Sequence, residues 1–355
     1  MRLARVALLS LCCVLVAQAG GGDTTRTGHG STARAVAYSW PRVRSAVRSQ
    51  WLVRFARQSA DPSTPAPQPA APTSVTPDDP QWPQQWGLAQ VDAPQAWALA
   101  PSRRQVVVAV VDSGVDPTQA DLQGALVPGA DFADGSGSTD DQYGHGTMVA
   151  GVIAARGNNG QGVAGACWTC LIMPIKVLGA DGTGTGSSIA AGIRYAADNG
   201  AQVINLSVIL NEADSDVESA IEYAESRGVL VVAAAGNSGA ADATYPASYP
   251  GVISVAATDQ TGQLYPWSTR GTWVTLAAPG CDVTTALGDA YDAFCGTSAA
   301  SPLVAGIAAL ALSTGDVSTA DVAAALERTA SPLPGGVADG RVDALQALEQ
   351  LLPQG

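Results

Sequence analysis

The sequence predicts an α/β fold, a mainly parallel twisted sheet with helices on both faces, and two recurring patterns carry this prediction. The first is a set of short apolar runs rich in β-branched residues, of which 105–112 (QVVVAVVD) is the clearest. Such runs are typical of strands buried on both faces of a parallel sheet. The second is a set of amphipathic helical segments between these runs, and strand–helix–strand alternation favours parallel strands with right-handed crossovers.

The predicted elements alternate in order along the chain. The segment 188–199 has apolar residues at helical spacing and ends before Gly200, a helix stop signal. The segment 216–227 repeats this arrangement before Gly228. In sheets of this kind, ligands and catalytic groups lie at the carboxyl ends of the strands. The predicted strands are 105–112, 171–178, 201–210, 229–235 and 252–257.

Composition bounds the class of protein. Of the 355 residues, 46% are hydrophobic and only 14% are charged, which excludes a disordered polyelectrolyte and permits a large core. The net charge of −13 excludes a general nucleic-acid binder. The charge is also divided unevenly, because residues 1–77 hold nine Arg and two Asp, while the remainder is strongly acidic. Two unlike pieces therefore meet near residue 78.

The first 19 residues have the pattern of a secretory signal peptide. Arg2 and Arg5 precede an apolar run, and Ala17–Ala19 forms a small-x-small cleavage signal. The alternative is a transmembrane anchor, but the apolar run is too short to span a bilayer. We therefore expect a secreted protein, extracellular or periplasmic, that has no membrane association after cleavage near Ala19.

Residues 20–77 are predicted to be a poorly ordered basic leader with a proline-rich linker. Seven prolines lie within 61–80, and proline fixes φ and removes backbone donors, so this stretch should be extended. The run 51–55 (WLVRF) has the composition of a short strand. The remainder of the chain, 78–355, is then expected to form one domain.

Four polar residues lie where strands and helices are predicted to end or begin. His145 is the only histidine after the leader, and Asp112 ends the first buried strand. Ser298 precedes an apolar, alanine-rich helix that ends near Leu312, and Asn237 follows the run 229–235. Taken singly, each has an ordinary structural interpretation, as a core histidine, a turn aspartate, a helix N-cap or a turn asparagine.

Together these four residues fit one chemistry. A nucleophilic serine requires a base to take its proton, a carboxylate to orient that base, and donors for the oxyanion. A helix N-terminus also offers free N–H groups to an anion. The sequence therefore predicts serine nucleophile chemistry, with one candidate for each role.

Three motifs resemble those of the subtilisin-like serine proteases, the subtilases. They are 111–116 (VDSGVD), 144–147 (GHGT) and 296–302 (GTSAASP), in the order Asp, His, Ser. The resemblance extends over about 78–350, and residues 78–97 are similar to the mature N-terminus of thermitase-like members. It implies a three-layer α/β/α fold and a secreted serine endopeptidase made as a precursor, in which residues 20–77 include a pro-segment. We expect cleavage of this pro-segment within 58–78, which leaves one catalytic domain over 78–355.

The resemblance assigns a role to each catalytic candidate. Ser298 would be the nucleophile, His145 the general base and acid, and Asp112 the orienting carboxylate. Asn237 and the Ser298 N–H would form the oxyanion hole. No cofactor is expected for catalysis. The expected partners are protein or peptide substrates and the chain's own pro-segment as an inhibitor, and the enzyme is expected to be a monomer.

Family members bind an extended peptide as an added strand. Gly182 and Gly184 would flank one side of it and Ser207 the other. The segment 233–236, which includes Ala234 and Gly236, would wall the pocket for the side chain before the scissile bond. Position 209 departs from the family pattern, because it is Ile where a Gly is usual, and a branched residue there would narrow the pocket or shift its rim.

The resemblance also implies a structural Ca²⁺. Oxygen ligands from three separate segments suit this ion, while the alternative is a solvated acidic surface. The matching positions are Asp79, Asp121, Asn159, Gln161 and the carbonyls of Arg156 and Val163.

Four cysteines remain once Cys12 and Cys13 leave with the signal peptide. An even number in a secreted protein indicates disulfides. Of the three pairings, we favour Cys167–Cys170 and Cys281–Cys295, because the members of each pair are close in sequence. The alternatives are a redox CxxC motif for the first pair and a four-cysteine zinc site, for which the second pair lacks the spacing.

Two other classes of function were weighed. A catalytically inactive, secreted, peptide-binding subtilase relative would show the same motifs, although the full set of catalytic candidates disfavours it. A nucleotide-binding α/β protein would need a phosphate loop, and the glycine-rich stretch 182–186 (GTGTG) lacks the required Lys.

Overall fold

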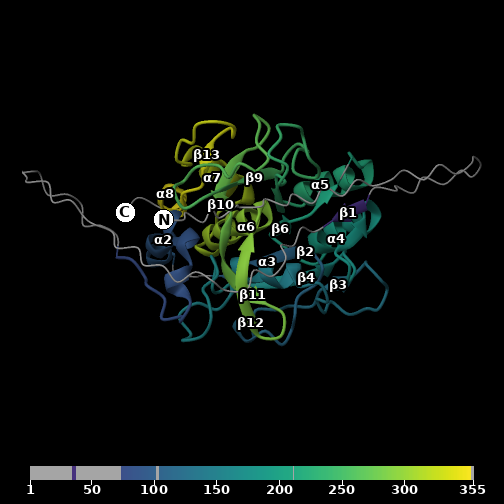
Figure 1. Ribbon diagram of the computed structural model, residues 1–355, viewed down its shortest axis with the longest axis horizontal. Helices are drawn as coiled ribbons and strands as arrows, with labels where there is room; N and C mark the ends of the chain where they lie inside the picture. Colours follow the sequence, from purple (N-terminus) through teal and green to yellow (C-terminus); the bar gives the residue numbers. More distant parts are fainter. Residues whose placement is uncertain (1–33, 37–72, 101–103, 211, 353–355) are drawn as a thin grey trace, which may run out of the picture.

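The computed structural model describes residues 34–36, 73–100, 104–210 and 212–352. An eight-stranded sheet forms its centre, in the order β13-β10-β9-β8-β6-β2-β4-β3, and every neighbouring pair in it is parallel (Figure 1). The predicted α/β fold with a mainly parallel sheet is confirmed. The strands are β2 (Val107–Asp112), β3 (Ala130–Asp131), β4 (Leu171–Lys176), β6 (Val203–Leu206), β8 (Leu230–Ala234), β9 (Ile253–Thr258), β10 (Leu276–Pro279) and β13 (Gly340–Arg341).

Helices cover both faces of this sheet. Because side chains alternate along a strand, Val108 and Val110 of β2 face one hydrophobic cluster, while Ala109 and Val111 face the other. The first cluster includes α3, α6 and α8, and the second includes α4 and α5. The helices are α1 (Trp86–Gln90), α2 (Ala93–Leu99), α3 (His145–Ala154), α4 (Gly186–Asp198), α5 (Ser215–Ser226), α6 (Thr297–Ser313), α7 (Thr319–Arg328) and α8 (Ala344–Leu351).

The helix α6 is the most deeply buried element. All its residues are buried, which is why its sequence is almost entirely apolar or small. It lies at the middle of the molecule in Figure 1, and the hairpin of β11 (Cys281–Ala286) and β12 (Ala290–Cys295) extends from beneath it. Within the part of the chain that the structure describes, no helix has the length and apolarity needed to cross a membrane.

The run 201–210 was predicted as one strand, and this prediction is wrong. The strand β6 stops at Leu206, and β7 (Ile209–Leu210) pairs in a separate three-stranded sheet. The break falls at Ser207, whose hydroxyl accepts from the Asn205 side chain at 2.9 Å and donates to the Ser298 carbonyl at 3.2 Å. At this position, side-chain hydrogen bonds take the place of strand pairing. The apolar pattern of 201–210 gave no sign of this break.

The small sheet contains three residues of the basic leader. Strand β1 (Arg34–Val36) lies antiparallel between β5 (Thr183–Thr185) and β7. Ala35 is opposite Gly184 on one side and Leu210 on the other. Residues 34–36, which belong to the leader predicted to be poorly ordered, thus pair with two strand edges of the following domain. The predicted signal peptide and the run 51–55 lie outside the described residues.

Candidate active site

Asp112 and His145 form a buried pair. Asp112 ends β2, His145 begins α3, and the His145 Nδ1 lies 2.8 Å and 2.9 Å from the two Asp112 carboxylate oxygens. The pair comes so close because Gly146 lets the first turn of α3 contact the loop after β2. A Cβ on Gly146 would lie 2.1 Å from the Gly114 carbonyl oxygen. The imidazole is thus fixed by a carboxylate on one of its two nitrogens.

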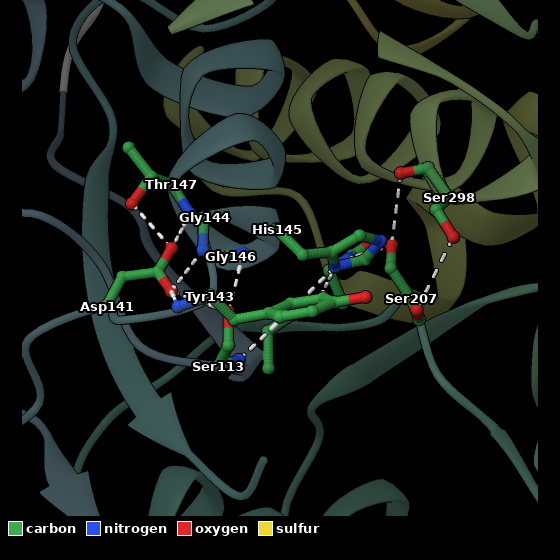
Figure 2. Close-up of polar contacts among 11 residues, drawn as sticks. Ser113, Asp141, Tyr143, Gly144, His145, Gly146, Thr147, Ser207 and Ser298 are labelled. Atoms are coloured by element: carbon green, nitrogen blue, oxygen red, sulfur yellow. Dashed lines mark hydrogen bonds and ion pairs between the residues drawn. The ribbon is translucent and has the colours of Figure 1, made fainter. Parts of the chain in front are cut away.

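Ser298 lies in the first turn of α6, across from this pair (Figure 2). Its hydroxyl donates to the Ser207 carbonyl at 3.4 Å, and the buried His145 Nε2 has no hydrogen-bond partner among the described residues. Catalytic hydrogen bonds are often long or misaligned before substrate binds. His145 and Ser298 therefore lie at the starts of two helices that pack together, and the second imidazole nitrogen makes no hydrogen bond within the described residues.

The Asn237 amide is held by its neighbour. Its Oδ1 accepts from the Thr297 N–H at 2.9 Å and from the Thr297 hydroxyl at 3.0 Å. The Thr297 hydroxyl in turn accepts from the Gly236 N–H at 3.0 Å. Because the Asn237 oxygen is engaged, its Nδ2 group is left to donate to another acceptor. The Ser298 N–H belongs to the first turn of α6, where backbone N–H groups lack helical partners.

A second network supports the turn that carries Ser298. Asn205, fully buried at the end of β6, accepts from the Ser301 hydroxyl at 2.8 Å and donates to the Ser207 hydroxyl at 2.9 Å. Ser207 then contacts the Ser298 backbone. The end of β6 and the start of α6 are therefore joined by side chains that sequence reasoning did not identify.

Asp141 is the main residue near the site that sequence reasoning missed. Burial raises the pKa of its carboxyl, although hydrogen bonds from Gly144, Thr147 and Ser113 oppose that effect. It joins the loop after Asp112 to the first turn of the helix that carries His145, as Figure 2 shows. The only signal was an acidic residue four positions before His145. The donors are the hydroxyls of Ser113 and Thr147 and the N–H groups of Tyr143, Gly144 and Thr147.

The predicted peptide-binding residues lie around the small sheet and the end of β8. Gly184 belongs to β5, and Gly182 directly precedes that strand. Ser207 lies just before β7 on the other side. Ala234 ends β8, and Gly236 follows it in a left-handed conformation with φ of 102°. The strands beside these two predicted flanks, β5 and β7, therefore border a slot for one added strand, and β1 lies in that slot.

Three of the residues predicted to hold Ca²⁺ come together. Asp79 and Asp121 are almost completely buried, and Asn159 donates to both, through its N–H to Asp79 at 3.3 Å and its amide to Asp121 at 3.0 Å. Val163 donates its N–H to Asp121 at 2.8 Å, and Gln161 donates its N–H to Asn159 at 2.8 Å.

The charges of this cluster favour a cation. Burial, and then the neighbouring charges of Asp121 and Asp78, raise the pKa of Asp79. The Arg156 guanidinium turns away to the carbonyls of Gly124 and Trp168. Among the described residues, no ion pair involves Asp79 or Asp121. Carboxylate and amide oxygens, such as those of Asp79, Asp121 and Asn159, are donors suited to a hard cation such as Ca²⁺.

Both favoured disulfides are present in the structure. Cys167 and Cys170 are completely buried in the core, with Cα atoms 5.4 Å apart, which does not fit an accessible redox motif. Cys281 and Cys295 are opposite each other at the base of the β11–β12 hairpin, with Cα atoms 4.1 Å apart. This second bond ends three residues before Ser298.

Comparison with known proteins agrees with this geometry. The family model described as "Subtilase family" (Peptidase S8) matches residues 103–348. Thermitase from Thermoactinomyces vulgaris is 42% identical over 279 residues, which cover 77% of this chain and 99% of thermitase. Subtilisin BL from Lederbergia lenta is 46% identical over 226 residues, covering 63% of this chain and 82% of that protein.

A solved structure supports the same assignment. It is described as proteases from Pseudoalteromonas arctica PAMC 21717, with a TM-score of 0.72 and 31% sequence identity. The match covers 78% of this chain and all of the other. The motifs, the parallel sheet, the buried Asp112–His145 pair and these relatives agree, and the chain belongs to the subtilase family of serine proteases.

Proposed function

We propose that this protein is a secreted serine endopeptidase, made as a precursor, that hydrolyses peptide bonds through Asp112, His145 and Ser298. The observation that carries the proposal is the buried carboxylate–imidazole pair beside a serine at the N-terminus of α6. The predicted signal peptide supports secretion, and the basic leader supports a precursor.

The reaction has two steps. In the first, His145 Nε2 takes the Ser298 proton as Oγ bonds to the substrate carbonyl carbon, and Asn237 Nδ2 and the Ser298 N–H stabilise the oxyanion. His145 then gives the proton to the leaving amine as the C–N bond breaks, which leaves an acyl-enzyme. In the second, water attacks the ester by the same route, releasing the acid and restoring the Ser298 hydroxyl. Asp112 keeps the imidazole oriented and stabilises its charge.

A fluorophosphonate probe tests this function directly, because it bonds only to an activated serine. We expect the processed protein to be labelled, with the modification on a peptide that contains Ser298. If the processed, folded protein is not labelled and cleaves no peptide, the inactive peptide-binding relative becomes the better description.

We also propose that the leader inhibits the enzyme as an added strand. Support comes from β1, whose backbone pairs with both edges of the predicted substrate slot, at Thr183–Thr185 and Ile209–Leu210. The charge is complementary, since the leader is rich in Arg and the rest of the chain is acidic. A strand in this position excludes a substrate that needs the same two edges.

Ala35→Pro should release this inhibition, because proline cannot donate a backbone hydrogen bond to a strand ladder. Loss of one hydrogen bond is worth about 1 kcal/mol, so we expect the precursor to be labelled by the probe about five-fold faster. Ala70→Pro, within the proline-rich stretch, is the matched control and should label like the wild type. Equal rates for all three precursors would remove β1 from the inhibitory role.

A structural Ca²⁺ held by Asp79, Asp121, Asn159 and Gln161, with the carbonyls of Arg156 and Val163, is part of the proposal. Bound ion would neutralise two buried carboxylates and join three segments. At a Ca²⁺ concentration 100-fold above Kd, binding stabilises the native state by about 2.7 kcal/mol. For a domain of this size, removal should lower Tm by roughly 5–10 °C.

The calcium prediction is checked by calorimetry of the processed protein in Ca²⁺ and in EDTA. Asp121→Asn should remove most of the difference between the two conditions. Asp242→Asn, at an exposed acid away from the cluster, should keep it. A wild-type Tm that is the same in Ca²⁺ and in EDTA would show that the cluster binds no stabilising ion.

A further inference from the structure

Three side chains surround the position that a side chain on Gly236 would occupy. A Cβ placed on Gly236 would meet Thr269 Oγ1 at 3.1 Å, Thr244 Cγ2 at 3.4 Å and Ile209 Cδ1 at 3.7 Å. Three side chains from three different segments therefore converge on this glycine. Their atoms border the space that the absent Gly236 side chain leaves open.

Hydrogen bonds hold the segments that carry these three side chains in place. The Thr244 hydroxyl donates to the Ala235 carbonyl at 2.7 Å, and the Thr269 N–H donates to the Gly236 carbonyl at 2.9 Å. Next to Ile209, the Leu210 N–H donates to the Tyr245 carbonyl at 2.7 Å, which ties β7 to the segment that carries Thr244. Because a strained movement of any one would break a hydrogen bond, the crowding is built into the fold.

The crowded space is beside the proposed nucleophile. Gly236 precedes Asn237, and its N–H donates to Thr297, the residue before Ser298. On the opposite side, the chain from Ile209 back to Ser207 leads to the Ser298 backbone. By the resemblance to subtilases, a side chain on the amino side of the scissile bond would enter between 207–209 and 234–236.

We propose that Ile209 and Thr244 close this pocket and make the enzyme selective for a small side chain, Gly, Ala or Ser, on the amino side of the scissile bond. This inference rests on the proposed endopeptidase function and adds its substrate class. Overfilling a packed site with extra methylenes is unfavourable. Aromatic and long aliphatic side chains are thus excluded by volume, with no charge or hydrogen bond required.

The experiment measures kcat/KM of the processed enzyme for quenched peptides that differ only at this residue. One methylene in a hydrophobic pocket changes kcat/KM by about 10–200-fold, so we expect Ala over Phe by at least about 10-fold. Ile209→Ala should raise the Phe-to-Ala ratio by about 10-fold or more. Thr244→Ser, which keeps the hydroxyl and removes only the methyl, should raise it in the same direction.

Two variants separate volume from other effects. Ile209→Val keeps the branched shape and most of the volume, and Thr244→Val keeps the branch and loses the hydroxyl. Both should retain the wild-type preference. If every variant has the same Phe-to-Ala ratio of kcat/KM, or if the wild type prefers Phe to Ala, the inference is overturned. Labelling of Ser298 would in that case still support the proposed protease function. Absence of labelling and of all cleavage would instead contradict the proposed function and the inference with it.

Discussion

Replacing Ser298 by alanine is expected to lower kcat by about 10⁶-fold. The reason is that the reaction then loses its covalent route, and the base His145 is left with no proton to take. This magnitude was measured in subtilisin itself, a member of the same family, where loss of the serine or the histidine alone costs about 2 × 10⁶. Residual hydrolysis would come from the oxyanion donors and substrate binding.

The measurement is kcat on a quenched peptide, with circular dichroism to show that the variant is folded. Ser313→Ala is the matched control, since Ser313 is a buried serine at the other end of α6 whose hydroxyl only donates to the Leu310 carbonyl. It should keep kcat within a few-fold. Ser298→Ala combined with His145→Ala should lose no more than Ser298→Ala alone, because the two residues act as a unit. Roughly additive losses, or near-normal activity of Ser298→Ala, would contradict the triad.

The fold was predictable from sequence because its central strands are buried on both faces. Runs such as 105–112 and 229–235 contain almost only apolar residues, and the structure places β2 and β8 within them. Short, half-exposed elements carried no such signal. The hairpin of β11 and β12 has partly exposed residues along most of its length, and no strand was predicted there.

The catalytic candidates were identifiable because they lie at the ends of strong elements. Asp112 closes a buried strand, and Ser298 opens a buried helix. Asp141 and Thr244 lie in loops, where the local sequence does not reveal which distant groups a side chain will meet. Their roles depend on contacts with Ser113 and Gly236, which only the tertiary structure brings near. The pairing of Arg34–Val36 was hidden for the same reason, since it depends on two distant edges.

Replacing Asn237 by alanine is expected to lower kcat by about 10²–10³-fold with little change in KM. The Nδ2 group is proposed to donate to the oxyanion, whose charge develops only in the transition state, so binding of the ground state is spared. This range, about 2.7–4 kcal/mol, was also measured for the corresponding donor in subtilisin. Asn199→Ala, at an exposed asparagine after α4, is the control and should leave both constants unchanged.

The Asn237 prediction has a finer form, because the side chain has two roles. Its Oδ1 accepts from Thr297, and this contact orients the Nδ2 donors. Asn237→Asp keeps an oxygen for Thr297 but replaces the donor with a negative charge, so it should lose at least as much kcat as Asn237→Ala. Thr297→Val removes one of the two bonds that orient the amide and should lose less than either. If Asn237→Asp retained activity while Thr297→Val lost it, Asn237 would act by holding the turn before Ser298 rather than by binding the oxyanion.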